Sequence, residues 1–205
     1  MVRVVLVPVK SFADAKARLA PVLAPNERER LARWTAERVL AAAGELPTFV
    51  ACDDEMVAEW ATLHGAQVLW RPGVGLNPAV NSGVAELRDR GVRHVIVAHG
   101  DLPCAERLAD TVIADTITLV PDARSDGTNV AAVPTGIDFE FAYGPGSFRR
   151  HLAHAIARGF HVAVRRDPRL CRDIDTPTDL AHPAVQETLP EWMPTNPASR
   201  LSTRA

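Results

Sequence analysis

The stretch HVIVAHGDLP, residues 94–103, decides the fold class. Residues 94–98 form a short, strongly apolar run, which is typical of a strand buried on both faces. Residues 99–103 are polar and contain a glycine, which is typical of a loop at the end of a strand. Strands of this kind belong to mostly parallel sheets, and ligands bind beyond the carboxyl ends of such strands.

Further apolar runs alternate with helical patterns along the chain, and this alternation predicts an α/β fold whose sheet is covered on both faces. Strands are expected at residues 4–9, 48–52, 67–70, 94–98, 117–120, 130–133 and 161–164. Helices are expected to begin near residues 25, 54, 77, 147 and 177, and one more is expected after residue 103. The fold domain is expected to cover residues 1–188, and residues 189–205 are expected to form a loosely structured tail.

Composition excludes several classes of protein. The net charge of −2 over 205 residues lacks the excess of basic residues that non-specific nucleic-acid binding needs. No apolar window reaches about 18 residues, so no membrane span and no membrane partner are expected. Three cysteines without a C-x-x-C pair argue against a disulfide framework or zinc site and favour a cytoplasmic location.

Cations cluster after the first strand. The 23 basic residues are 21 arginines and only two lysines, Lys10 and Lys16, and both lysines lie in this loop with Arg18. Cations at a strand end suit a polyphosphate, because they neutralise its charge. A solvated basic loop remains the alternative.

Two aspartates follow strand-like or extended segments. Asp101 comes directly after the central strand, and Asp175 shares one side of an extended segment with Asp173. One or two carboxylates together with phosphate and water are the usual ligands of Mg²⁺ in proteins. The alternatives are that Asp101 caps a following helix and that Asp175 or Thr176 caps the helix that begins at Pro177.

A third group of polar residues comes from residues 126–129 and 143–147. Thr128 and Ser147 offer hydroxyls and Gly144 offers its amide, and a glycine-rich stretch before a helix is a common anion site. The alternative is a turn followed by an ordinary Ser147 N-cap. His151 lies on the same helix face as Ser147, where a surface position is the simpler expectation.

The loop at residues 71–78 contains two glycines and two prolines. Asn77 followed by Pro78 is typical of a helix start, with Asn77 as the N-cap.

Together these segments resemble one family, the CofC/FbiD guanylyltransferases of deazaflavin coenzyme F-420 biosynthesis. The resemblance rests on VPVKSFADAKARL (7–19), GLN (75–77), HGDLP (99–103), PDARSDGTN (121–129), YGPGSFRRH (143–151) and DIDTPTDL (173–180). It implies a single-domain nucleotidyltransferase fold, GT-A-like and Rossmann-like, with a mixed, mostly parallel sheet. The wider superfamily usually carries a G-x-G-x-R loop after the first strand, whereas this chain has VKSFADAKAR.

The resemblance also implies the reaction and its residues. Magnesium would be bound by Asp101 and Asp175, the acceptor by Thr128, Gly144 and Ser147, and the nucleotide by Lys10, Lys16, Arg18 and Asn77. Lys16, Arg18, Asp101 and Asp175 would act in catalysis. The substrates would be GTP and a small phosphorylated acid.

The expected reaction is transfer of GMP to that acid with release of pyrophosphate. Phosphoenolpyruvate is favoured, and 2-phospho-L-lactate and 3-phospho-D-glycerate stay open. The alternatives are another nucleotidyltransferase of the same fold, acting on a molybdopterin or a sugar phosphate, and a non-catalytic nucleotide-binding module. A homo-oligomer is compatible with the sequence.

Overall fold

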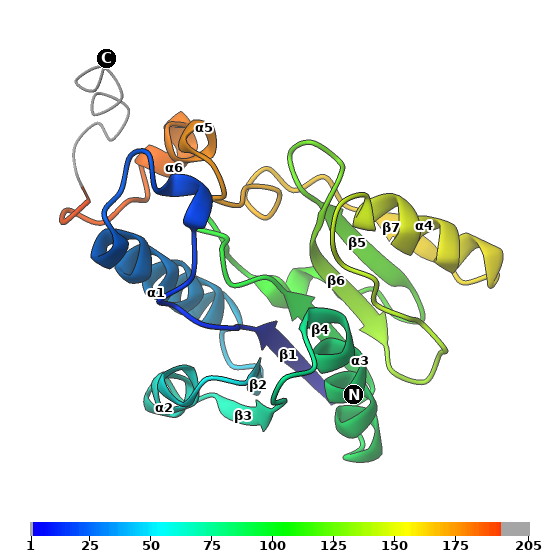
Figure 1. The fold of residues 1–205 in the computed structure, drawn as a ribbon. Helices are drawn as coiled ribbons and strands as arrows, with labels where there is room; N and C mark the ends of the chain where they lie inside the picture. The colour runs from blue at the N-terminus through cyan, green and yellow to red at the C-terminus, as the bar shows by residue number, and fades with distance from the viewer. Residues whose placement is uncertain (1, 194–205) are drawn as a thin grey trace.

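The computed structural model describes residues 2–193, and a seven-stranded sheet forms its centre (Figure 1). The strand order is β3-β2-β1-β4-β6-β5-β7. The strands are β1 (Arg3–Pro8), β2 (Thr48–Cys52), β3 (Gln67–Trp70), β4 (His94–Ala98), β5 (Ile117–Pro121), β6 (Thr128–Pro134) and β7 (Val162–Val164). Of these, only β6 runs against the others, because it pairs antiparallel with both β4 and β5. The expected mixed, mostly parallel sheet is therefore confirmed.

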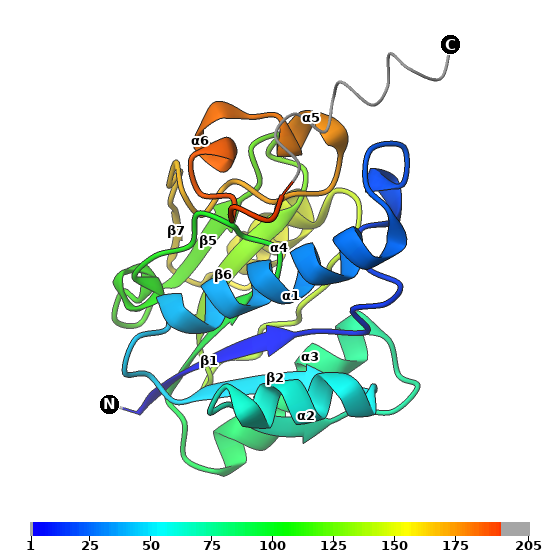
Figure 2. The same cartoon turned by 90° about the vertical axis from the view of Figure 1, so that its left-hand side faces the viewer.

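Helices cover both faces of the sheet. Figure 2 shows α1 (Pro25–Ala42) and α2 (Glu55–Leu63) in front of the sheet, with α3 (Leu76–Asp89) and α4 (Ser147–Ala157) behind it. Alternate residues of β1 explain this arrangement: Val5 and Val7 pack with α1, whereas Val4 and Leu6 pack with α3 on the opposite face. The chain has no described helix with the length and apolar character needed to cross a membrane.

Short helices complete the chain: η1 (Ala17–Leu19), η2 (Leu108–Thr111), α5 (Pro177–Leu180) and α6 (Pro183–Gln186). A separate apolar cluster joins η1 to the C-terminal segments, with Leu19 packed among Ile174 and Leu180. This cluster holds residues 173–175 near the loop that follows β1. Trp192 and Met193 pack on the same cluster, while residues 194–205 of the expected tail lie outside the described residues.

Three local expectations are wrong. The segment after Pro103 forms only the 3-10 turn η2 and no α-helix. Helix α3 begins at Leu76 after Gly75, whose φ of 75° lets the chain turn, so Asn77 lies inside the first turn and is not the N-cap. Helix α4 likewise begins after Gly146 at φ 73°, so Ser147 is its first helical residue and not its cap.

Candidate functional site

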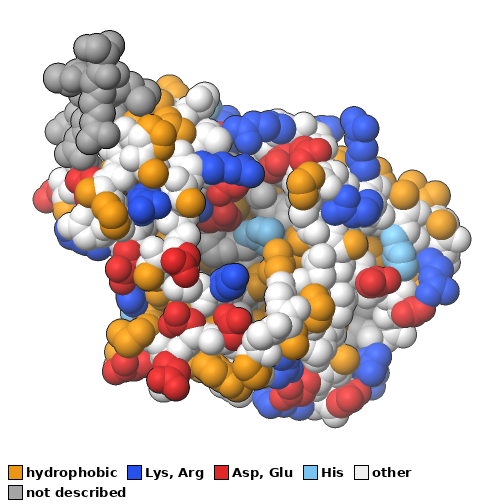
Figure 3. Space-filling model, viewed as in Figure 1, with side chains coloured by type: hydrophobic (Ala, Val, Ile, Leu, Met, Phe, Trp, Pro, Cys, Tyr) orange, Lys and Arg blue, Asp and Glu red, His pale blue; other side chains and the backbone are white. Residues whose placement is uncertain are grey.

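A cavity of about 660 Å³ opens where β1, β2 and β4 end. The loop after β1 contributes Lys10 and Lys16, and the segment after β4 contributes Gly100 and Asp101. Figure 3 shows acidic and basic side chains bordering a hollow near the middle of one face. The carboxyl ends of the parallel strands therefore form the site, as expected for this class of sheet.

Lys16 lies at the centre of the charges in this cavity. Its Nζ is 3.2 Å from Asp101 Oδ2 and 3.6 Å from Asp175 Oδ1, and its side chain is only 6% exposed. Its backbone has φ 58° and ψ 34°, a left-handed conformation that costs an L-residue about 1–2 kcal/mol. The two ion pairs offset this cost and fix the loop against the end of β4.

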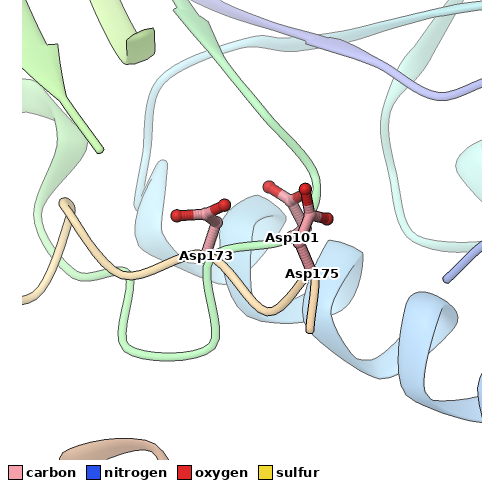
Figure 4. Close-up of side chains that lie close together, drawn as sticks. All are labelled: Asp101, Asp173 and Asp175. Carbon is pink, nitrogen blue, oxygen red and sulfur yellow. The ribbon is translucent and has the colours of Figure 1, made fainter. Parts of the chain in front are cut away.

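Three carboxylates converge beside Lys16. Each of Asp101, Asp173 and Asp175 offers an oxygen within 4.8 Å of the others. Figure 4 shows them pointing to the same side, with Asp101 on the segment after β4 and the other two on one C-terminal segment. A main-chain bond from Ile174 N–H to Asp101 C=O, 3.1 Å long, holds the two segments together.

The three carboxylates do not share one electrostatic environment. Burial raises the pKa of Asp173 to about 6, and the nearby Asp101 charge adds to this effect. Burial is the largest single influence on Asp101 and acts to raise its pKa, but the Lys16 ammonium, the His99 ring and a main-chain hydrogen bond together lower the net pKa. The ammonium therefore compensates Asp101 and Asp175, while Asp173 receives a 3.5 Å contact from the Asn129 amide and a main-chain hydrogen bond.

Capping does not account for these aspartates. Thr176 is the N-cap of α5, because its Oγ accepts from Asp179 N–H while Asp179 Oδ2 accepts from Thr176 N–H. Asp175 is thus left to face Lys16, and Asp101 precedes no α-helix. Asp101 Oδ1 is buried without a hydrogen-bond partner among the described residues. Oxygen ligands with one orphaned carboxylate atom fit a hard divalent cation.

The other two cations lie farther out. Arg18 Nη1 is 3.8 Å from Asp175 Oδ2, and its side chain is 74% exposed. Lys10 is exposed and lines the cavity. Lys10 therefore borders the cavity and Arg18 lies outside its wall beside Asp175, whereas Lys16 is paired with both aspartates.

Thr128, Ser147 and His151 form a buried group at the start of β6 and α4. Thr128 N–H donates to Ser147 Oγ at 3.0 Å, and Thr128 Oγ1 lies 3.0 Å from His151 Nδ1. Ala142 N–H donates to His151 Nε2 at 2.8 Å, so that nitrogen carries no proton and Nδ1–H donates to Thr128 Oγ1. His151 is also fully buried, so the expected surface position is wrong.

Gly144 and the start of α4 lie beside this group. Asp126 Oδ2 accepts from Gly146 N–H at 3.1 Å, and Asp126 C=O accepts from Phe148 N–H at 3.0 Å. The Asp126 residue therefore supplies the cap that the sequence assigned to Ser147. Gly144 has φ 117°, a backbone conformation that residues with a side chain rarely adopt.

Asn77 lies outside the cavity wall, although Gly75 and Leu76 belong to it. Its side-chain amide donates a hydrogen bond to Tyr143 C=O at 3.1 Å and accepts one from Tyr143 N–H at 2.7 Å. The nucleotide contact expected for Asn77 stays a prediction, because this structure uses its amide within the protein.

Two polar atoms of the site were missed by the sequence reasoning. His99 Nε2 and Tyr143 OH are buried without a partner among the described residues, and the two rings lie 4.7 Å apart. His99 begins the HGDLP segment and Tyr143 begins the YGPGS segment, and their places in these motifs were the sequence signal that could have pointed to them. Burial raises the pKa of Tyr143, which keeps the phenol a neutral hydrogen-bond donor.

Comparison with known proteins decides the family. The profile described as "Guanylyl transferase CofC like" matches residues 3–185. The chain belongs to the CofC guanylyltransferase family. The family and activity class expected from the sequence are thereby confirmed.

Relatives named phosphoenolpyruvate guanylyltransferase cover most of this CofC-family chain. One from Sphaerobacter thermophilus is 37% identical over 88% of this chain and 91% of its own. One from Rubrobacter xylanophilus is 34% identical over 86% and 90%. A putative nucleotide-diphospho-sugar transferase from Desulfovibrio desulfuricans has the same fold, with a TM-score of 0.74 at 14% identity over 98% of this chain and 94% of its own.

Proposed function

We propose that this protein transfers GMP from GTP to phosphoenolpyruvate and releases pyrophosphate. The observation that carries the proposal is the cavity at the carboxyl ends of β1 and β4, where Lys16 meets Asp101 and Asp175. Such a cavity offers both cations for a triphosphate and carboxylates for a metal ion. The substrate comes from the relatives, which carry the name phosphoenolpyruvate guanylyltransferase.

The reaction is an in-line displacement. A phosphate oxygen of the acceptor forms a bond to the α-phosphorus of GTP, and the bond from that phosphorus to the oxygen bridging to the β-phosphorus breaks. Pyrophosphate leaves with that oxygen and its electron pair. The acceptor phosphate is already ionised at neutral pH, so the protein needs no general base and contributes positioning and charge neutralisation.

Asp101, Asp173 and Asp175 would hold Mg²⁺, whose charge would offset the negative charge of the phosphates. Lys16 would exchange its carboxylate partners for phosphate oxygens when the nucleotide binds. Arg18 and Lys10, which lie at the exposed side, would neutralise the departing pyrophosphate.

The acceptor would lie beside Thr128, Gly144 and Ser147. Because the Ser147 hydroxyl already accepts from Thr128 N–H, it would shape the pocket more than it contacts the ligand. Thr128 accepts from His151, so its own hydroxyl proton is available to donate to an anionic acceptor. Gly144 would allow close approach of that anion to the main chain.

The test is a competition among phosphoenolpyruvate, 2-phospho-L-lactate and 3-phospho-D-glycerate with GTP and Mg²⁺, read by mass spectrometry of the guanylated products. Phosphoenolpyruvate should be consumed first, and Asp101→Asn should abolish most turnover while the fold is kept. Preferred guanylylation of another acid would overturn the acceptor assignment. If none of the three acids gives pyrophosphate release, the protein is a non-catalytic nucleotide-binding module instead.

A further inference from the structure

Two asparagines of α3 bind the segment that leads into Gly144. Asn77 Nδ2–H donates to Tyr143 C=O at 3.1 Å, and Tyr143 N–H donates to Asn77 Oδ1 at 2.7 Å. One helical turn later, Asn81 Nδ2–H donates to Phe141 C=O and Phe141 N–H donates to Asn81 Oδ1, both at 2.9 Å. We call these four hydrogen bonds the asparagine ladder.

The ladder works because an asparagine side chain carries the same donor and acceptor as a peptide group. Side chains four residues apart on a helix are displaced by roughly 6 Å along its axis. Alternate residues of an extended chain are displaced by about 6.5–7 Å. The two asparagines therefore pair with Phe141 and Tyr143 as the edge of a neighbouring strand would.

The position of the ladder connects the two halves of the site. Asn77 follows directly after Gly75 and Leu76, which line the cavity. Tyr143 directly precedes Gly144, where the expected acceptor residues begin. Arg150 closes the same segment from the other side, because its guanidinium donates to the carbonyl oxygens of Ala142 and Pro145.

We propose that Asn77 and Asn81 are positioning residues that hold the acceptor-binding segment in register with the wall of the nucleotide cavity. The inference rests on the proposed function and adds a determinant of acceptor binding to it. Asn77 is the nearer of the two to Gly144, so it has the larger effect. The acceptor concerned is a small phosphorylated acid, whose anionic groups meet the segment that the ladder fixes.

The experiment measures KM for GTP and for phosphoenolpyruvate separately in Asn77→Ala and Asn81→Ala. Asn77→Ala should raise the acceptor KM roughly tenfold, equivalent to about 1.4 kcal/mol, and Asn81→Ala should raise it less. The GTP KM should rise less than the acceptor KM in both variants. Asn77→Asp keeps the size but loses the donor to Tyr143 C=O, so it should resemble Asn77→Ala.

Val84→Ala is the matched control, because Val84 lies on α3 and packs on the same face of the sheet without joining the ladder. It should lower the melting temperature and leave the ratio of the two KM values unchanged. An equal rise of both KM values in Asn77→Ala, or an Asn77→Asp variant with wild-type kinetics, would overturn the proposal and leave the ladder a stability element.

Hydrogen exchange provides a second measurement in the wild-type protein, in case a variant does not fold. The amides of Phe141 and Tyr143 should exchange slowly in the free protein, although neither belongs to a helix or strand. Fast exchange at both would show that the ladder does not persist in solution and would overturn the inference. A wild-type protein that guanylylates no acid would instead refute the proposed function, whatever the exchange rates.

Discussion

Replacing Lys16 by methionine removes one charge and keeps most of the side-chain volume. In the free protein this change leaves Asp101 and Asp175 without the ammonium that lies 3.2 and 3.6 Å from them. Three carboxylates then face one another, and the exposed Arg18 guanidinium, 3.8 Å from Asp175 Oδ2, is the cation that still contacts the group. We expect the variant to be less stable than the wild type in the absence of a divalent cation.

The expected loss follows from the burial of the partners. Breaking a buried ion pair by removing one partner costs about 3–5 kcal/mol. Because the Asp101 and Asp175 side chains are 24% and 40% exposed, solvent screens part of that cost, and we expect about 2–3 kcal/mol. In a domain of this size each kcal/mol shifts the melting temperature by about 2–4 °C, so the shift should be about 4–12 °C.

Magnesium should reverse this loss. At the proposed metal site, magnesium would compete with the Lys16 ammonium for the same carboxylates in the wild type, whereas in Lys16→Met that ammonium is absent. Melting temperatures measured by differential scanning fluorimetry over a magnesium titration should therefore rise more in Lys16→Met than in the wild type. Lys10→Met, measured in the absence of nucleotide, is the control, because the Lys10 side chain is exposed. If magnesium raises all three melting temperatures equally, Lys16 does not occupy the metal site.

Three further predictions concern the buried residues around Tyr143. Burial lowers the pKa of His151 to about 4, below its unfolded value of about 6.5, so stability should fall by up to about 3 kcal/mol as pH drops through this range. Urea midpoints at pH 7 and 5 test this, and an equal change in His151→Gln would rule out the ring as the source. Tyr143→Phe removes an orphaned hydroxyl and should raise the free energy of unfolding by about 1 kcal/mol; a decrease would mean that the hydroxyl has a partner. Ser147→Ala should cost about 1–3 kcal/mol and speed exchange of the Thr128 amide, because that buried N–H loses its acceptor; unchanged exchange would contradict the contact.

The strands and the position of the site could be predicted because both follow from local pattern. The apolar runs at His94–Ala98 and Thr48–Cys52 match β4 and β2 residue for residue. Since the carboxyl ends of parallel strands meet at one edge, the polar residues after them had to gather there. Lys16, Asp101 and Asp175 accordingly lie together in the structure.

The side-chain partners could not be predicted, because local pattern ranks only local partners. Ser147 and Asn77 both precede helical stretches, and short polar residues there usually cap the helix. In the structure Gly146 and Gly75 make the turns instead, and the two side chains bond main-chain groups 19 and 66 residues away. Residue type predicts the capacity to bond, whereas the packing of α3 and α4 decides which group is within reach.

The same limit on predicting side-chain partners applies to Asp173 in the candidate metal site. Its alternation with Asp175 predicted a shared side, but only the packing of the C-terminal segment on η1 brings both within reach of Asp101. The sequence therefore predicted two ligands of a candidate metal site where the structure offers three.

Strand β6 connects the carboxylate group with the group formed by Thr128, Ser147 and His151, the proposed metal and acceptor halves of the site. Thr128 and Asn129 are its first residues, and neighbouring side chains of a strand point to opposite faces. Thr128 reaches Ser147 and His151 of α4, while Asn129 donates to Leu170 C=O at 3.0 Å and lies 3.5 Å from Asp173. Because β6 also pairs with β4, directly before His99, its register fixes both halves against Asp101. A change that shifts β6 by a fraction of an ångström should therefore alter the proposed acceptor pocket and the carboxylate group at once, so its effects on the two cannot be separated by kinetics.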